Sequence, residues 1–300
     1  MRALCSKYNI SITKSKGQNF LVDSGITEKI VRRSGIGGNC GVLEVGPGLG
    51  ALTRELCRVA GRVTAVELDA RLLPALRETL AGATRQGSGV PTPQQQQAMC
   101  DVGNIDIVHG DVLRLDITGL VREKMPGLEY HVCSNLPYNI TTPALSALIE
   151  AGIFKTITVM VQKEVAALIC AVPGTPEYGA FTIYARYHTE PVTLFDVPPD
   201  CFIPRPKVMS SVLTMNIREK KLLSVEEERY LFKIVRASFG QRRKTLVNAL
   251  HSAFGEHITK AGLTGIVQSC GYDAMVRGET LDLDGFIKLT SVMNLLGTVK

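Results

Sequence analysis

The most informative segment of the chain reads Gly41-Val42-Leu43-Glu44-Val45-Gly46-Pro47-Gly48-Leu49-Gly50. Its first half has the apolar character of a buried strand, and its second half is a tight glycine-rich turn. A helical pattern follows directly over residues 51–60. Strand, glycine loop and helix are the first unit of a doubly wound α/β sheet, which we predict as the fold class.

The glycine loop predicts a ligand site, because glycines let the backbone approach a ligand with a helix N-terminus behind it. The next predicted strand ends in Glu67, about 20 residues beyond Gly46, where a carboxylate can accept both hydroxyls of a ribose. Two cofactors fit this pattern. One is a dinucleotide used for hydride transfer, because Gly46-x-Gly48-x-x-Ala51 matches the dinucleotide-binding fingerprint. The other is S-adenosylmethionine, which is favoured by Glu44, since this acid has no role in hydride transfer.

A second turn, Asn135-Leu136-Pro137-Tyr138, follows a predicted strand. Asn135 offers a side-chain carbonyl, and Pro137 fixes its own φ and restricts Leu136, which holds the backbone carbonyls in place. Tyr138 adds a flat aromatic face. This combination suits the binding of an exocyclic amino group on a flat heterocycle. Taken alone the pattern also fits a simple loop with a core tyrosine, and the glycine loop upstream favours the site.

Asp111 comes directly after a predicted strand at residues 105–109. In open α/β sheets, ligands bind at the carboxyl ends of strands, so this carboxylate could accept a hydrogen bond from an adenine amino group. The alternative is a simple helix cap. His109 is more simply an edge residue than a catalyst.

Composition excludes several classes of protein. The chain has 300 residues, of which 45% are hydrophobic and 21% charged, as in ordinary globular proteins. No apolar run approaches the roughly 20 residues needed to cross a bilayer, and the polar N-terminus is not a secretory signal. The eight cysteines lack any Cys-x-x-Cys pair. We expect reduced thiols, no metal, no membrane association and a cytoplasmic location.

Two basic clusters on a chain of net charge +6 favour a polyanionic partner, most simply nucleic acid. The first includes Lys14 and Lys16 in the N-terminal arm, and the second holds Arg236, Arg242, Arg243 and Lys244 without an acid. The alternative is a solvated face. Such residues would contact phosphates, which position an RNA without specifying its sequence.

The chain divides into two expected domains. Residues 1–218 form the α/β domain with its basic arm, and residues 219–300 form a small all-α RNA-binding domain after a polar linker. Residues 81–103 are rich in Gly, Pro and Gln, which predicts a flexible surface insertion.

Taken together, these motifs occur in an order that resembles the ribosomal RNA adenine N6-dimethyltransferases, and most closely their bacterial small-subunit branch. The motifs are Gln18–Leu21, Glu44–Gly50, Glu67–Asp69, Gly110-Asp111, Asn135–Ile140, Gln162–Val165, Tyr178-Gly179, Val197–Pro199, Phe202–Val208 and Phe239–Leu246. The resemblance covers about residues 14–290. It implies a Rossmann-like class I methyltransferase that uses S-adenosylmethionine.

Site residues follow from the motifs and the resemblance. Those expected at the cofactor are Gln18, Asn19, Leu21, Glu44, Gly46, Gly48, Glu67, Asp111 and Asn135. The resemblance further implies that Asn135 and the carbonyl of Pro137 hold the adenine N6, while Tyr138 and Phe202 stack on the base.

The expected activity is methyl transfer to N6 of two adjacent adenines near the 3′ end of 16S rRNA, in the small ribosomal subunit, by a monomer. Hydrogen bonds accepted from the N–H groups would make the nitrogen pyramidal and restore its lone pair, so no strong general base is needed. Two alternatives stay open. One is a 23S rRNA dimethylase of the Erm resistance type, and the other is a ribosome assembly factor for which methylation is secondary.

Overall fold

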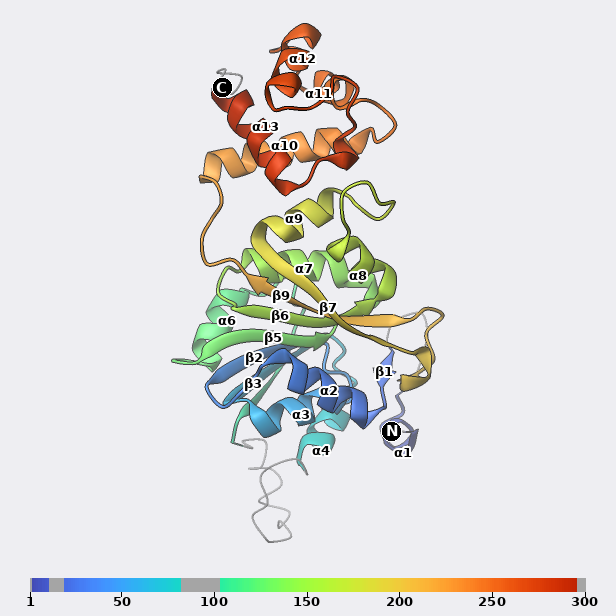
Figure 1. Cartoon of the computed structure of the whole chain (residues 1–300). Helices are drawn as coiled ribbons and strands as arrows, with labels where there is room; N and C mark the ends of the chain where they lie inside the picture. Colours follow the sequence, from blue (N-terminus) through green and yellow to red (C-terminus); the bar gives the residue numbers. More distant parts are fainter. Residues whose placement is uncertain (1, 11–18, 82–102, 296–300) are drawn as a thin grey trace. The chain divides into compact units, whose positions relative to one another are not determined.

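A computed structural model describes residues 2–10, 19–81 and 103–295 of the chain (Figure 1). It divides into two compact units. The first comprises Met1–Ala166 and Val192–Ile217, and the second comprises Ala167–Pro191 and Arg218–Lys300. Lys14, Lys16, Gln18 and nearly all of the expected insertion lie outside the described residues.

The first unit is built on a seven-stranded sheet in the order β4-β3-β2-β5-β6-β9-β7. The strands are β2 (Cys40–Val45), β3 (Arg62–Glu67), β4 (Ile105–His109), β5 (Glu129–Asn135), β6 (Thr156–Gln162), β7 (Thr189–Val197) and β9 (Ser210–Ile217). Strands β2 to β6 pair in parallel, whereas β9 is antiparallel to β6. This arrangement confirms the predicted α/β sheet. The strand order reverses between β2 and β5, which is where open α/β sheets bind ligands.

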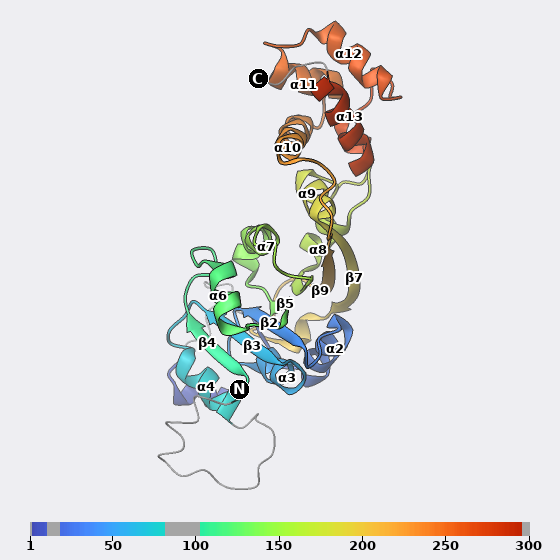
Figure 2. The same ribbon diagram turned by 90° about the vertical axis from the view of Figure 1, so that its left-hand side faces the viewer.

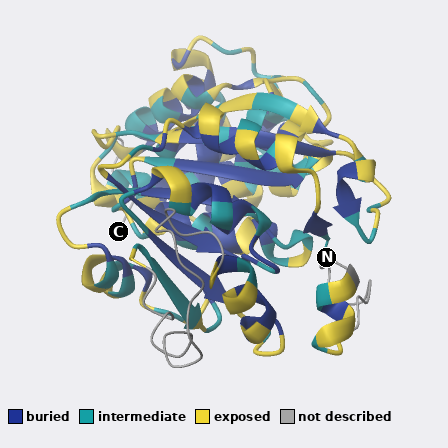
Figure 3. Ribbon diagram, turned by 90° about the horizontal axis from the view of Figure 1, so that it is seen from below, coloured by how far each residue is buried: buried dark blue, intermediate teal, exposed yellow. Residues whose placement is uncertain are grey.

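Helices cover both faces of this sheet, with α2 and α3 on one face and α6 and α7 on the other (Figure 2). The helices of the first unit are α1 (Arg2–Lys7), α2 (Ser24–Ser34), α3 (Ala51–Val59), α4 (Leu73–Ala81), α6 (Ile117–Lys124) and α7 (Thr141–Glu150). Every residue of β2 is buried, and the central strands are dark in Figure 3. Burial on both faces explains why these strands read as continuous apolar runs.

A two-stranded ribbon lies beside the main sheet. Strand β1 (Phe20–Leu21) is antiparallel to β8 (Phe202–Ile203), with Leu21 opposite Phe202. This pairing brings the Gln-Asn-Phe-Leu motif against the Phe-x-Pro motif, although about 180 residues separate them in the sequence.

The second unit is helical and has its own core. It contains α9 (Ala180–His188), α10 (Val225–Gly240), α11 (Leu246–Phe254), α12 (Lys260–Ser269) and α13 (Leu283–Leu295), with the last residues of α8 (Lys163–Cys170). Its buried cluster includes Tyr178, Leu231 and Phe286. The sequence-based division placed residues 167–191 in the first domain, whereas in the structure they belong to this unit.

Hydrogen bonds and a ring contact explain why residues 167–191 belong to the second unit. The Tyr178 hydroxyl donates to the carbonyl of Leu281 at 2.7 Å, and its ring meets Phe239 edge-on. The backbone N–H of Gly174 donates to the carbonyl of Glu279 at 2.8 Å. These partners lie far apart in the sequence, so no local pattern reveals them.

Within the described ranges, none of the helices has the length and apolar character needed to span a membrane.

Candidate active site

A cavity of about 430 Å³ opens at the carboxyl ends of β2, β3, β4 and β5. Its volume suits a small-molecule ligand. The structure brings ten of the expected site residues to its wall, namely Asn19, Leu21, Glu44, Gly46, Gly48, Glu67, Asp111, Asn135, Pro137 and Tyr138. Residues from five separate segments of the chain therefore meet at one place.

The glycine loop lies directly against the Asn135–Tyr138 turn, which we call the catalytic turn, and against Phe20 of β1. Gly46 and Gly48 have φ angles of +71° and +59°, which L side chains rarely adopt. A Cβ on Gly46 would lie 3.2 Å from Cγ of Pro137, and one on Gly48 would lie 3.0 Å from the Phe20 ring. Glycine is therefore required here by both backbone conformation and space.

Glu67 supports the glycine loop from the end of β3. Its carboxylate accepts the backbone N–H of Gly48 at 3.1 Å and that of Asp69 at 2.8 Å. Burial raises the pKa of this carboxyl, while these two hydrogen bonds act in the opposite direction. The same side chain thus holds the loop and presents oxygen to the cavity.

Asp111 is half-buried, and its Oδ1 accepts the backbone N–H of Leu113 at 3.0 Å. This hydrogen bond belongs to a turn and not to a helix N-terminus, because the next helix, α6, begins at Ile117 and is capped by Asp116. The interpretation of Asp111 as a helix cap is therefore wrong, and the residue lines the cavity as expected for a ligand contact.

Glu44 is almost completely buried beneath the cavity. Burial raises the pKa of its carboxyl to about 8, with repulsion from Glu67 as a smaller cause. Its Oε2 has no hydrogen-bond partner among the described residues. A positively charged ligand beside it, such as the ammonium and sulfonium groups of S-adenosylmethionine, would favour the ionised form of this carboxyl.

Asn135 also has a buried side-chain oxygen without a hydrogen-bond partner among the described residues. Its Nδ2 donates to the carbonyl of Asn19 at 3.2 Å, which fixes the side-chain amide. Its Oδ1 is buried and has no partner in the part of the chain that the structure describes. An unmade hydrogen bond at a buried carbonyl is costly, so this atom is suited to receive a donor from a ligand.

The carbonyl of Pro137 does not fit its expected role as the second acceptor. It already accepts the N–H of Ile140 and the hydroxyl of Thr141, both at 3.2 Å, at the short helical turn η2 (Tyr138–Ile140). The Thr141 hydroxyl, which has a single proton, also lies 3.3 Å from the carbonyl of Tyr138, so the Pro137 oxygen is engaged by Ile140 and shares Thr141. The preceding residue, Leu136, also lines the cavity, and its N–H is fixed by the carbonyl of Met160 at 3.1 Å.

Of the two residues expected to stack on the base, one lines the cavity and the other does not. Tyr138 is half-buried and lines the cavity. Phe202 is 2% exposed, packs in a core cluster with Leu21 and is absent from the cavity wall. Its stacking on a base stays a prediction that would require the side chain to move.

Comparison with known proteins identifies the family. The model of the family "Ribosomal RNA adenine dimethylase" matches residues 9–284. The chain belongs to the ribosomal RNA adenine dimethylase family. This confirms the predicted family and S-adenosylmethionine as the methyl donor, and removes the dinucleotide alternative.

Two curated relatives of this dimethylase carry the name Ribosomal RNA small subunit methyltransferase A. The one from Shouchella clausii is 42% identical and covers 97% of this chain and 93% of its own length. The one from Clostridioides difficile is 39% identical, and the match covers 98% of this chain and 94% of the relative's own length.

Solved structures support the fold. A dimethyladenosine transferase from Plasmodium falciparum has a TM-score of 0.74 at 22% identity, covering 93% of this chain and 98% of that one. The 23S rRNA methyltransferase ErmE has a TM-score of 0.67 at 24% identity, covering 92% and 100%.

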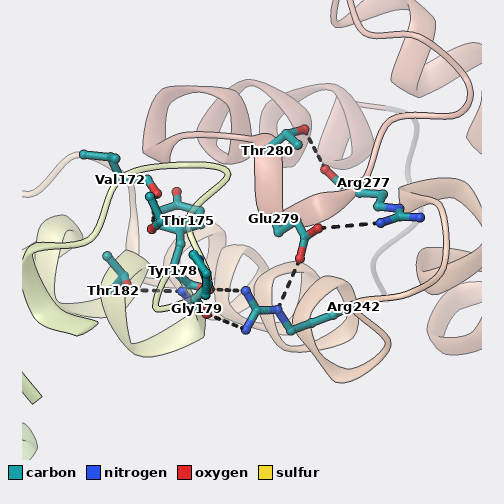
Figure 4. Close-up of polar contacts among 10 residues, drawn as sticks. Val172, Thr175, Tyr178, Gly179, Thr182, Arg242, Arg277, Glu279 and Thr280 are labelled. Carbon is teal, nitrogen blue, oxygen red and sulfur yellow. Dashed lines mark hydrogen bonds and ion pairs between the residues drawn. The ribbon is translucent and has the colours of Figure 1, made fainter. Parts of the chain in front are cut away.

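Four basic residues of the dimethylase's second unit are exposed, namely Arg236, Arg242, Arg243 and Lys244. Arg242 also donates to the carbonyls of Pro176 at 3.0 Å and Tyr178 at 2.9 Å, and pairs with Glu279 at 3.3 Å (Figure 4). Arg242 therefore fastens the loop before α9 to the helical core.

One contact of the dimethylase site could not be predicted from the sequence. Ser210, the first residue of β9, forms a hydrogen bond with the hydroxyl of Tyr138. A serine in a predicted strand carries no information about which side chain it meets. No group of His, Cys, Asp or Glu side chains within the described ranges is arranged to hold a metal.

Proposed function

We propose that the protein transfers methyl groups from S-adenosylmethionine to N6 of two adjacent adenines near the 3′ end of 16S rRNA, in the small ribosomal subunit. The two small-subunit methyltransferases at 42% and 39% identity support this target. The Oδ1 of Asn135, a buried acceptor without a partner among the described residues, is the single observation that carries the chemistry.

The acceptors of the catalytic turn would activate the amine. The lone pair of adenine N6 is delocalised into the ring, which makes it a poor nucleophile. Hydrogen bonds accepted by Oδ1 of Asn135 and by the carbonyl of Leu136 would hold both N–H bonds out of the ring plane. The nitrogen then becomes pyramidal, and its lone pair becomes available for attack on the methyl group.

Positioning supplies most of the remaining acceleration. Well-oriented reactants gain on the order of 7–11 kcal/mol over free ones. The methylated nitrogen is acidic and loses its proton to water, so no side chain has to act as a strong base. The base must leave its stack, which costs a few kcal/mol and is offset by stacking on Tyr138.

The cavity residues divide the cofactor among them. We propose that Glu67 binds the ribose hydroxyls, that Asp111 accepts from the adenine amino group, and that Glu44 faces the positively charged end. Asn19 and Leu21 would close the cavity from β1. S-adenosylmethionine supplies an activated methyl group when bound.

RNA binding belongs to the exposed basic residues of the second unit. We propose that Arg236, Arg243 and Lys244 contact phosphates, and that the protein acts as a monomer on small subunits in the cytoplasm, during their maturation. Phosphate contacts fix orientation, while the accessible adenines decide the target.

The test is transfer of labelled methyl groups to three acceptors: unmethylated small subunits, naked 16S rRNA and naked 23S rRNA. We expect dimethyladenine on the small-subunit RNA. Label on 23S rRNA would assign the protein to the Erm type. Tight binding to subunits without any label would instead indicate an assembly factor.

A further inference from the structure

The ring of Tyr138 is held at its far end by a distant strand. Its hydroxyl lies 2.6 Å from Oγ of Ser210, although 72 residues separate the two in the chain. Ser210 is completely buried, whereas the Tyr138 ring is half-buried and lines the cavity. The hydrogen bond therefore connects the cavity wall to the interior of the sheet.

Both ends of this side chain are fixed. Tyr138 follows Pro137, whose ring restricts the backbone, so the Cα end is set by the turn. Ser210 is paired with Gln162 of β6, and the N–H of Lys163 donates to the carbonyl of Met209 at 3.0 Å. A tyrosine ring has two rotatable bonds, and a hydroxyl tied to a rigid strand removes that freedom.

We infer that Ser210 is a positioning residue for methyl transfer, because it fixes the plane of the Tyr138 ring on which the target adenine stacks. The inference rests on the proposed role of Tyr138 as the stacking surface. The plane matters because the base must present N6 to Oδ1 of Asn135 and to the methyl group at once. A misplacement of about 1 Å can cost roughly a hundredfold in rate.

The second methylation depends on this plane more than the first. After one transfer N6 carries a methyl group, so fewer orientations of the base fit between the catalytic turn and the ring. Loss of the Ser210 hydroxyl should therefore slow the second transfer more than the first, and monomethyladenine should accumulate.

The neighbouring residue provides a matched control. Ser211 lies on the same strand and is 1% exposed, and its hydroxyl donates to Oδ1 of Asp196 at 2.6 Å. Asp196 in turn pairs with Lys163 at 2.7 Å. Ser211→Ala thus removes a buried serine hydrogen bond of similar length without touching Tyr138.

The experiment measures single-turnover methyl transfer to unmethylated small subunits, the Kd for S-adenosylmethionine, and the ratio of mono- to dimethyladenine. Ser210→Ala and Tyr138→Phe should each lower the rate about tenfold, within the range that misplacement can cause. The double variant should be no slower than either single variant, because both changes remove the same bond. The Kd should not change, and Ser211→Ala should transfer at the wild-type rate.

Several outcomes would overturn the inference. They are a wild-type rate in Ser210→Ala, multiplied losses in the double variant, or an equal loss in Ser211→Ala, which would indicate a structural role. Tyr138→Ala separates this inference from the proposed function. If Tyr138→Ala is inactive while Tyr138→Phe and Ser210→Ala are fully active, only the role of Ser210 fails. If Tyr138→Ala is fully active, the stacking role itself fails.

Discussion

Two adjacent arginines, Arg242 and Arg243, should respond to the same substitution in opposite ways. Both side chains are exposed, but Arg242 also donates hydrogen bonds to two backbone carbonyls of the helical unit. Arg242→Gln should therefore lower stability and leave the salt dependence of RNA binding unchanged. Arg243→Gln should leave stability unchanged and weaken the salt dependence of RNA binding.

The magnitude for Arg242 follows from its three contacts. Hydrogen bonds from a charged group contribute about 1.5–3 kcal/mol each when buried. The Arg242 side chain is 40% exposed, so solvent screens these contacts, and the ion pair with Glu279 adds less than about 1 kcal/mol. We expect a loss of about 2 kcal/mol in the free energy of unfolding, or roughly 4–8 °C in Tm.

The assay combines thermal melting with RNA affinity measured across a series of salt concentrations. Each lost phosphate contact lowers the slope of log K against log salt by about 0.7–0.9. We expect that change for Arg243→Gln, with a melting temperature like that of the wild type. The reasoning would be refuted if Arg242→Gln melted like the wild type and lowered the salt slope.

Three further predictions concern the cavity. Glu67→Ala should raise the Kd for S-adenosylmethionine about 10- to 100-fold by calorimetry, since it removes the charge-assisted hydrogen bonds to the loop and those proposed to the ribose. An unchanged Kd would contradict this. Gly46→Ala should abolish methyl transfer by pressing on Pro137, whereas Gly35→Ala, with a φ of +72° and open space around it, should cost only stability; equal activity would count against the packing argument. In the cofactor-free protein, the pKa of the Glu44 carboxyl is raised from 4.5 to about 8. Between these two pH values the folded protein keeps a proton that the unfolded chain has released. The free energy of unfolding should therefore fall as pH rises through this range. The urea midpoint, measured from pH 5 to pH 8.5, should fall less with pH in Glu44→Gln than in the wild type. The same pH dependence in both proteins would argue against a buried neutral carboxyl.

Local patterns were sufficient for the sheet and the cavity. The apolar run before Gly46 and the glycines after it determine a buried strand and a turn by themselves, and parallel strands bring their carboxyl ends together. Asn135 and Glu67 could therefore be placed at one site without knowledge of their partners.

Side-chain direction could not be predicted in the same way. A cluster of arginines shows charge but does not show that Arg242 turns inward to the carbonyls of Pro176 and Tyr178. Likewise, the restricted φ of Pro137 did not reveal that its carbonyl accepts the N–H of Ile140 and contacts the hydroxyl of Thr141. Such partners are set by the fold and not by the neighbouring sequence.

In the proposed mechanism, Oδ1 of Asn135 accepts a hydrogen bond from the target amine. The most direct measurement compares single-turnover methyl transfer by the wild type and Asn135→Ala on unmethylated small subunits, at saturating S-adenosylmethionine. We predict that the variant binds subunits normally and loses about 2–4 kcal/mol of transition-state stabilisation, which is roughly a 30- to 1000-fold slower transfer. Transfer by Asn135→Ala at the wild-type rate would contradict it.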